Sequence, residues 1–111
     1  MKKTLLIGLA VLLFFSCEKS NIVEHENYIG VWTNVNGSLT RTLEVNPSGR
    51  SYYEEMTISG NTSTSVSYNG NFVLNDSILK IGFKKLIINE EPTMYDGKWY
   101  LIMDNREYKK K

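Results

Sequence analysis

The sequence is short of the residues that build metal centres and disulfides: it has one cysteine, Cys17, and one histidine, His25. A single cysteine cannot form an intramolecular disulfide, and without Cys/His spacing elsewhere there is no zinc framework. The folded part of the chain must therefore be held together by packing and strand pairing alone.

The sequence also has no large excess of charge of either sign, because it contains 13 Lys and Arg residues and 12 Asp and Glu residues. Loss of a leader containing Lys2 and Lys3 would leave 13 − 2 = 11 basic residues and a net charge of −1. This balance predicts no nucleic-acid partner. A length of 111 residues leaves room for one domain with one modest core.

The sequence has one long hydrophobic run, residues 5–15 (LLIGLAVLLFF), which follows a short basic start and precedes Ser16-Cys17. This order is typical of a secretory signal peptide. The run is well below the ~20 residues of a membrane-spanning helix, so we do not expect a transmembrane segment.

The cysteine at the end of this leader resembles the processing site of bacterial lipoproteins, with Ser16 as the small residue before the cut and Cys17 as the lipid acceptor. Phe14 and Phe15 depart from the commoner Leu-Ala/Ser pattern. The resemblance implies a signal peptide over 1–16 and a multiply acylated Cys17, and each buried methylene of such chains contributes about 0.8 kcal/mol. Glu18 is not the Asp that marks inner-membrane retention, which favours the outer membrane of a Gram-negative bacterium, in either leaflet. The alternative is a free or buried thiol behind an ordinary signal sequence.

Residues 17–27 are polar and without a sustained period, which predicts a flexible tether. His25 lies in this segment. A catalytic or metal-binding histidine needs partners on a rigid scaffold, so we interpret His25 as a solvated linker residue.

From Tyr28 onward, apolar residues alternate with polar ones between closely spaced turn signals. The pattern predicts a domain over 28–111 that is all-β, an antiparallel up-and-down meander of about eight strands forming a small barrel or half-open barrel. The residues expected to face inward are Leu39, Arg41, Leu43, Val45, Tyr52, Met56, Ile58, Val66, Tyr68, Gly70, Phe72, Leu74, Leu79, Ile81, Phe83, Trp99, Leu101 and Met103. Glu90-Glu91-Pro92 is expected to interrupt pairing, and Asp96-Gly97 to form a tight turn.

Three short motifs resemble small lipocalin-like domains of bacterial lipoproteins: Gly30-Val31-Trp32, the stretch 43–49 (LEVNPSG) and the stretch 68–72 (YNGNF). The resemblance implies a barrel with Trp32 packed across one end. About eight short strands enclose little more than their own side chains, so a shallow groove is expected rather than a deep cavity. If a pocket for a small apolar ligand exists, its candidate residues are Trp32, Tyr68, Phe72 and Trp99.

Catalytic groups are scarce, because the domain offers only carboxylates, lysines and tyrosines for proton transfer. Glu54 and Glu55 are neighbours, and neighbours in a strand point to opposite faces. Glu54 is placed on the apolar face with Arg41, where the two could form an ion pair across the hairpin. We therefore predict no enzyme activity, no cofactor and no metal; the alternative is an envelope hydrolase using Glu54.

Aromatic residues are frequent, and the alternation assigns Trp32, Tyr68 and Trp99 to the core but Tyr53 and Tyr100 to the surface. The leading hypothesis is a non-catalytic binding or interaction module, held at the membrane by lipidated Cys17, whose partner is a protein, a glycan or a small apolar ligand. The alternative is a carrier of a small apolar ligand in a barrel pocket.

Overall fold

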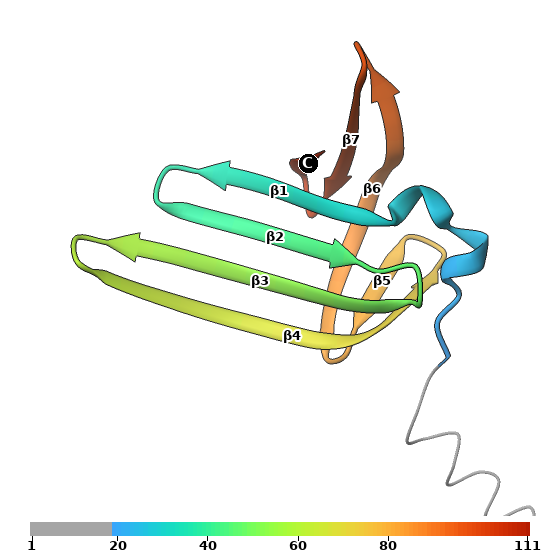
Figure 1. The fold of residues 1–111 in the computed structure, drawn as a ribbon, viewed down its shortest axis with the longest axis horizontal. Coiled ribbons are helices and arrows are strands. Elements are labelled where there is room, and N and C mark those ends of the chain that lie inside the picture. The colour runs from blue at the N-terminus through green and yellow to red at the C-terminus, as the bar shows by residue number, and fades with distance from the viewer. Residues whose placement is uncertain (1–18) are drawn as a thin grey trace, which may run out of the picture.

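The computed structural model describes residues 19–111, which form eight antiparallel strands in a closed barrel (Figure 1). The strands are β1 (Gly30–Asn36), β2 (Leu39–Val45), β3 (Arg50–Ser59), β4 (Thr62–Asn75), β5 (Ile78–Ile81), β6 (Lys84–Tyr95), β7 (Lys98–Met103) and β8 (Arg106–Lys110). Each pairs with the next, and β8 returns to β1 through Trp32–Lys110 and Thr33–Lys109. The predicted eight-stranded meander is confirmed, and it closes. The predicted leader over 1–16 and Cys17 lie outside the described residues.

Large apolar side chains from every strand occupy the barrel interior. The register places Trp32, Leu43, Tyr53 and Tyr68 directly across from one another on four successive strands. The largest side chains with almost no exposed surface are Trp32, Leu43, Tyr53, Phe72, Leu79, Ile81, Leu86, Leu101, Met103 and Tyr108. Burying a large aliphatic or Phe side chain contributes about 1.5–3 kcal/mol, so this core is the main source of stability.

The prediction for β3 was wrong by one residue. Ser51 and Tyr53 point inward and are buried, whereas Tyr52 is half-buried and Ile58 is exposed. Both faces of this strand carry an aromatic residue, so its alternation does not fix which face is buried. Pairing with β2 and β4 fixes it, because a shift of one residue would exchange the two faces completely.

The turn between β5 and β6 explains a second error. Leu79 and Ile81 are fully buried as predicted, but Phe83 is 100% exposed. Gly82, with φ +61°, and Phe83 form the turn itself, so Phe83 leaves the alternation. Gly70 of β4 packs against this turn, where a Cβ on Gly70 would lie 2.3 Å from the Gly82 nitrogen.

The expected interruption at residues 90–92 takes the form of two register shifts in the β6–β7 pairing, within a strand that continues to Tyr95. The tight turn at Asp96-Gly97 joins β6 to β7 as predicted.

The segment before β1 folds against one end of the barrel as two short 3-10 helices, η1 (Ile22–Glu24) and η2 (Glu26–Tyr28). Asn21 pairs with β4: its backbone NH donates to Phe72 O (3.2 Å) and its side chain exchanges two hydrogen bonds with the backbone of Leu74. Ile22 and Tyr28 are buried. From Asn21 onward, the segment interpreted as a tether is thus packed on the barrel. No helix within residues 19–111 has the length and apolar character needed to span a bilayer.

The side chain of Lys110, at the end of the last strand, lies over the rings of the two tryptophans. Lys110 Nζ lies 5.1 Å from the Trp32 ring centroid and 5.3 Å from that of Trp99, and burial lowers the Lys110 pKa. Gly30, at φ +137°, leaves the space for it, because a Cβ there would lie 2.9 Å from Lys110 Cε. The Trp32 indole NH donates to Tyr28 O (2.9 Å). The Gly30-Val31-Trp32 motif therefore has a structural role at this end of the barrel.

Candidate interaction surface

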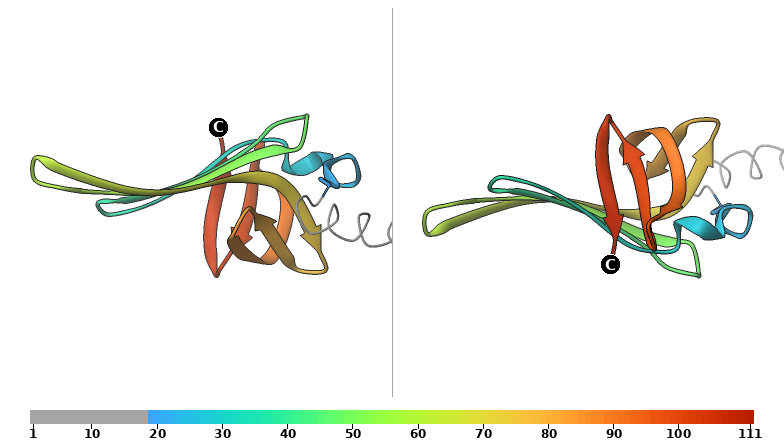
Figure 2. Two further views of the ribbon diagram at one scale, coloured as in Figure 1. Left: turned by 90° about the horizontal axis from the view of Figure 1, so that it is seen from below. Right: turned by 90° about the horizontal axis from the view of Figure 1, so that it is seen from above.

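Strands β1 to β4 continue well past the barrel as a thin, twisted extension made of two hairpins, visible in Figures 1 and 2. Pairing between β1 and β8 covers only two residue pairs and reaches no further than Thr33–Lys109. Beyond that point β1 to β4 pair only among themselves. We call residues 34–41 and 55–66 the projecting sheet.

The outer part of the projecting sheet carries no charge. The chain has 13 basic and 12 acidic residues, yet none falls within 34–40 or 56–66. Three apolar side chains there are at least half exposed: Val35 (68%), Ile58 (53%) and Val66 (50%). Depletion of charge around exposed apolar residues is a compositional feature of protein interfaces rather than of ordinary surface.

Both faces of the projecting sheet present small polar and apolar side chains. The register aligns Val35, Thr40, Met56 and Ser65 in a row on one face, and Asn36, Leu39, Thr57 and Thr64 on the other. The barrel body stands on only one side of the sheet and at one end of it (Figure 2).

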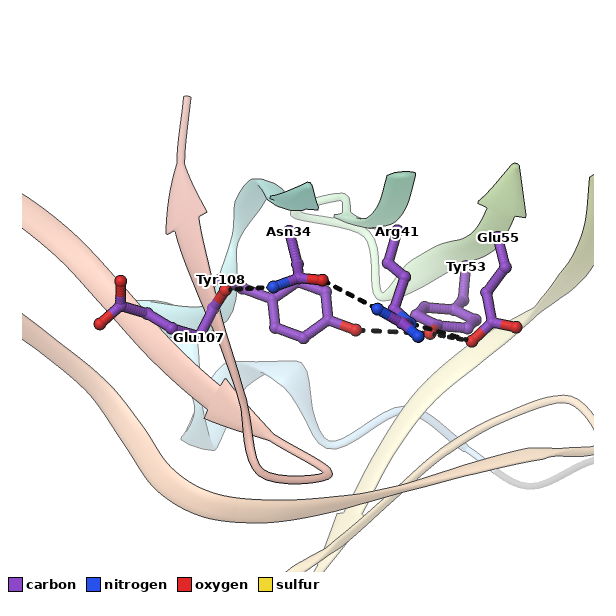
Figure 3. Close-up of polar contacts among 6 residues, drawn as sticks. All are labelled: Asn34, Arg41, Tyr53, Glu55, Glu107 and Tyr108. Carbon is purple, nitrogen blue, oxygen red and sulfur yellow. Dashed lines mark hydrogen bonds and ion pairs between the residues drawn. The ribbon is translucent and has the colours of Figure 1, made fainter. Parts of the chain in front are cut away.

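A polar network ties the base of the projecting sheet to the barrel (Figure 3). Arg41 is only 7% exposed; its Nη1 donates to Asn34 Oδ1 (3.0 Å), and its Nε lies 3.4 Å from Glu55 Oε2. Asn34 Nδ2 in turn donates to the backbone oxygen of Glu107 on β8 (2.9 Å). These side chains continue the connection between β1 and β8 just beyond their last backbone pair. Arg41 pairs with Glu55, so the ion pair expected with Glu54 is wrong. The cause is the one-residue error in β3, which exchanged the two faces of that strand.

Two tyrosine hydroxyls complete the network. Tyr53 donates to Glu55 Oε2 (2.8 Å) and its hydroxyl lies 3.4 Å from that of Tyr108. Burial raises the pKa of both tyrosines, so both hydroxyls stay neutral. Burial alone would raise the Glu55 pKa, but the Tyr53 hydrogen bond and the cations of Lys84 and Arg41 outweigh it and lower that pKa. Glu55 is therefore a stably ionised partner for the Arg41 guanidinium, and the arrangement serves to orient the sheet.

The four candidate ligand residues belong to the core or its edge. Trp32 and Phe72 have no exposed surface, and Tyr68 and Trp99 are half-buried. The Tyr68 ring stacks on that of Tyr53 at 6.4 Å between centroids, while Trp99 lies beneath Lys110. All four residues therefore take part in packing the barrel. None of them lines the hollows described next.

An open hollow of about 380 Å³ lies on the outer face of β6, β7 and β8. Its lining is Glu90, Thr93, Met94, Tyr95, Tyr100, Ile102, Glu107 and Lys109. Tyr100, predicted to be on the surface, is half-buried here, with Lys109 Nζ 6.0 Å from its ring centroid. Tyr53, the other predicted surface tyrosine, is buried in the core.

The barrel end near η1 and η2 has two open hollows of about 290 Å³ each, both lined in part by His25, Tyr28 and Glu91. His25 is half-buried and its ring lies 6.0 Å from those of Tyr28 and Phe72, so it is less solvated than predicted. Within residues 19–111, no three His, Cys, Asp or Glu side chains are grouped to hold a metal ion.

Glu54, the acid considered for hydrolysis, lies on the face of β3 opposite the network and accepts a hydrogen bond from the Tyr52 hydroxyl (2.8 Å). It lines none of the three hollows described above.

Comparison with models of protein families, with curated proteins and with solved structures found no match to this chain. The projecting sheet is thus identified by geometry and composition. One signal for it was present in the sequence, the uncharged run 56–69, but that run is informative only once the strands are known to extend beyond the barrel.

Proposed function

We propose that this chain is an outer-membrane lipoprotein, exported by a signal peptide over 1–16 and anchored through lipidated Cys17, whose domain is a non-catalytic interaction module. The projecting sheet is the part that binds. The observation that supports this most is the uncharged, two-faced extension of β1 to β4 outside the barrel.

The same observations give less support to a carrier of a small apolar ligand. A ligand pocket usually encloses most of its ligand's surface. The aromatic residues considered for such a pocket are engaged in the core, and the three hollows described above are open at the surface.

The anchor would hold the domain close to the membrane. Four residue steps separate Cys17 from Asn21, which is already hydrogen-bonded to β4. A chain of that length spans at most about 14 Å. The end of the barrel near η1 then lies at the lipid surface, and the projecting sheet reaches away from the anchored end.

Metabolic labelling with a fatty acid tests the anchor. The full chain should carry the label and stay with the membrane, and the Cys17→Ser chain should carry none. Label retained by Cys17→Ser would refute lipidation at this residue.

Photo-crosslinking in intact cells tests the binding surface. A benzophenone amino acid is placed at Ile58 on the projecting sheet or at Ile87 on the barrel, two isoleucines of nearly equal exposure (53% and 54%). We expect a discrete adduct from Ile58 and none from Ile87. Adducts from Ile87 alone, or from neither position, would contradict a binding role for the projecting sheet.

A further inference from the structure

The outer edge of β4 is an unprotected β-sheet edge. Strand β5 pairs only with the end of β4, from Phe72 to Asn75. Residues 62–68 pair with β3 on one side, and no other strand within residues 19–111 pairs with them on the other. Half of their backbone NH and CO groups therefore point outward, ready to pair with another strand.

Proteins usually protect such an edge by making the edge strand short or by placing a charged residue, a proline or a β-bulge in it. The stretch 62–68 (TSTSVSY) has no charge and no proline, and its register with β3 is unbroken. The opposite edge of the projecting sheet differs: β1 extends only over 34–36 beyond its pairing with β8, and the Asn34 side chain bridges to β8. The β4 edge is thus the long, accessible one.

We propose that this edge binds a second copy of the chain, with β4 pairing antiparallel to β4 across a two-fold axis so that the two projecting sheets join into one eight-stranded sheet. The inference rests on the proposed function and names the partner of the same surface. An antiparallel pair of identical strands is self-complementary by symmetry.

The side chains on the strand suit this pairing. With the axis at Ser65, Thr64 would lie opposite Val66 of the other copy, and Ser63 opposite Ser67. All of these are uncharged, so no like charges meet, and β-branched and hydroxyl pairs are favourable across strands. Val66, half exposed in one copy, would lie against the side-chain methyl group of Thr64 in the other.

Because both copies are anchored in the membrane, a small β4–β4 interface is enough to hold the dimer together. Seven paired residues span about 24 Å, which places the contact among small interfaces, below about 1,200 Å². Two copies attached to one membrane meet at a much higher effective concentration than in solution. If the joined sheet lies parallel to the membrane, the two-fold axis is normal to both, the two N-terminal segments lie at the same height above the membrane, and both anchors can enter it.

The test is a cysteine scan of the full, membrane-bound chain. Ser63, Thr64, Ser65, Val66 and Ser67 are replaced by Cys one at a time, with Ser48→Cys in the exposed β2–β3 turn as the matched control, and membranes are treated with a mild oxidant. Each step away from the axis moves the two cysteines apart by about two residue lengths, roughly 7 Å. A disulfide needs Cα atoms within about 7 Å, so we expect one sharp maximum of dimer, about tenfold above Ser48→Cys. Equal dimer at all positions, or dimer no higher than in the control, would overturn the proposal.

A charge exchange supplies a second readout. At the position of the maximum, Lys in both copies should abolish energy transfer between fluorescently labelled copies in the same vesicles, and Lys in one copy with Glu in the other should restore it. Energy transfer of the same efficiency in the Lys/Lys and Lys/Glu combinations would overturn the proposed β4 pairing. If Ile58 gives an adduct with another protein while the cysteine scan gives no maximum, self-pairing fails and the interaction module stands; if both fail, the proposed function fails as well.

Discussion

Replacing Glu55 by Gln should destabilise the domain far more than replacing its neighbour Glu54 by Gln. Glu55 accepts the Tyr53 hydrogen bond and pairs with Arg41, which is only 7% exposed. Removing one partner of a fully buried ion pair costs about 3–5 kcal/mol, because the other charge stays buried. The Glu55 side chain is 35% exposed, so solvent screens part of the interaction and we expect a loss of about 1–2 kcal/mol.

The Cys17→Ser full chain suits the measurement, with thermal unfolding followed by the fluorescence of Trp32 and Trp99. For a domain of this size, 1 kcal/mol corresponds to a shift in Tm of about 4–8 °C. Glu55→Gln should therefore lower Tm by roughly 5–15 °C and Glu54→Gln by clearly less. An equal or larger effect of Glu54→Gln would refute the orientation of β3 and the network built on it.

The effect should depend on pH. The pKa of Glu55 is lower in the folded protein than its ordinary value of 4.5. A lowered carboxyl pKa stabilises the fold above the unfolded pKa, and this stabilisation is lost as pH falls through the folded pKa. The stability difference between the wild-type chain and Glu55→Gln should thus be full at pH 7 and shrink below about pH 4.5. A difference that does not change from pH 7 to pH 3 would show that the Glu55 charge contributes nothing.

Further outcomes follow from the packing. Gly30→Ala should cost about 1–3 kcal/mol, because φ +137° is a conformation reserved for glycine. Part of that loss, measured by urea unfolding, should be recovered when Lys110→Ala removes the side chain that the new Cβ meets; no recovery would show that the contact is unimportant. Phe72→Ala should cost about 3–5 kcal/mol, and Phe83→Ala less than about 0.5 kcal/mol, since Phe83 is 100% exposed. Similar losses for the two phenylalanines would place Phe83 in the core.

The strands were predictable because their signals are local. Alternation and turn residues such as Asn46-Pro47-Ser48-Gly49 and Asp96-Gly97 depend on neighbouring residues alone. They indicate eight strands, although β6 continues through the expected interruption at 90–92. The buried face of β3 was not predictable in the same way. Tyr52 and Tyr53 offer equal aromatic content to either face, and only the cross-strand register with Leu43 and Tyr68 decides between them.

The candidate surface depends on relations between distant strands. Strand β4 has 14 residues whereas its neighbour β5 has 4 and β8 has 5, so a barrel closed by the short strands leaves the long ones projecting. Strand lengths could be approximated from the sequence, but the alignment of short strands with long ones depends on how the barrel closes. The network of Asn34, Arg41 and Glu55 was missed for the same reason, since it joins β1, β2 and β3 to β8.

Amide hydrogen exchange along residues 62–68, at low protein concentration in the Cys17→Ser chain, tests the central claim most directly. In an edge strand, successive amides alternate between the paired side and the free side. We predict slow exchange for every second amide of this stretch and fast exchange for those between. Uniform protection would mean that another part of the chain covers the β4 edge, uniform fast exchange would mean that the projecting sheet does not form, and either result would contradict the account.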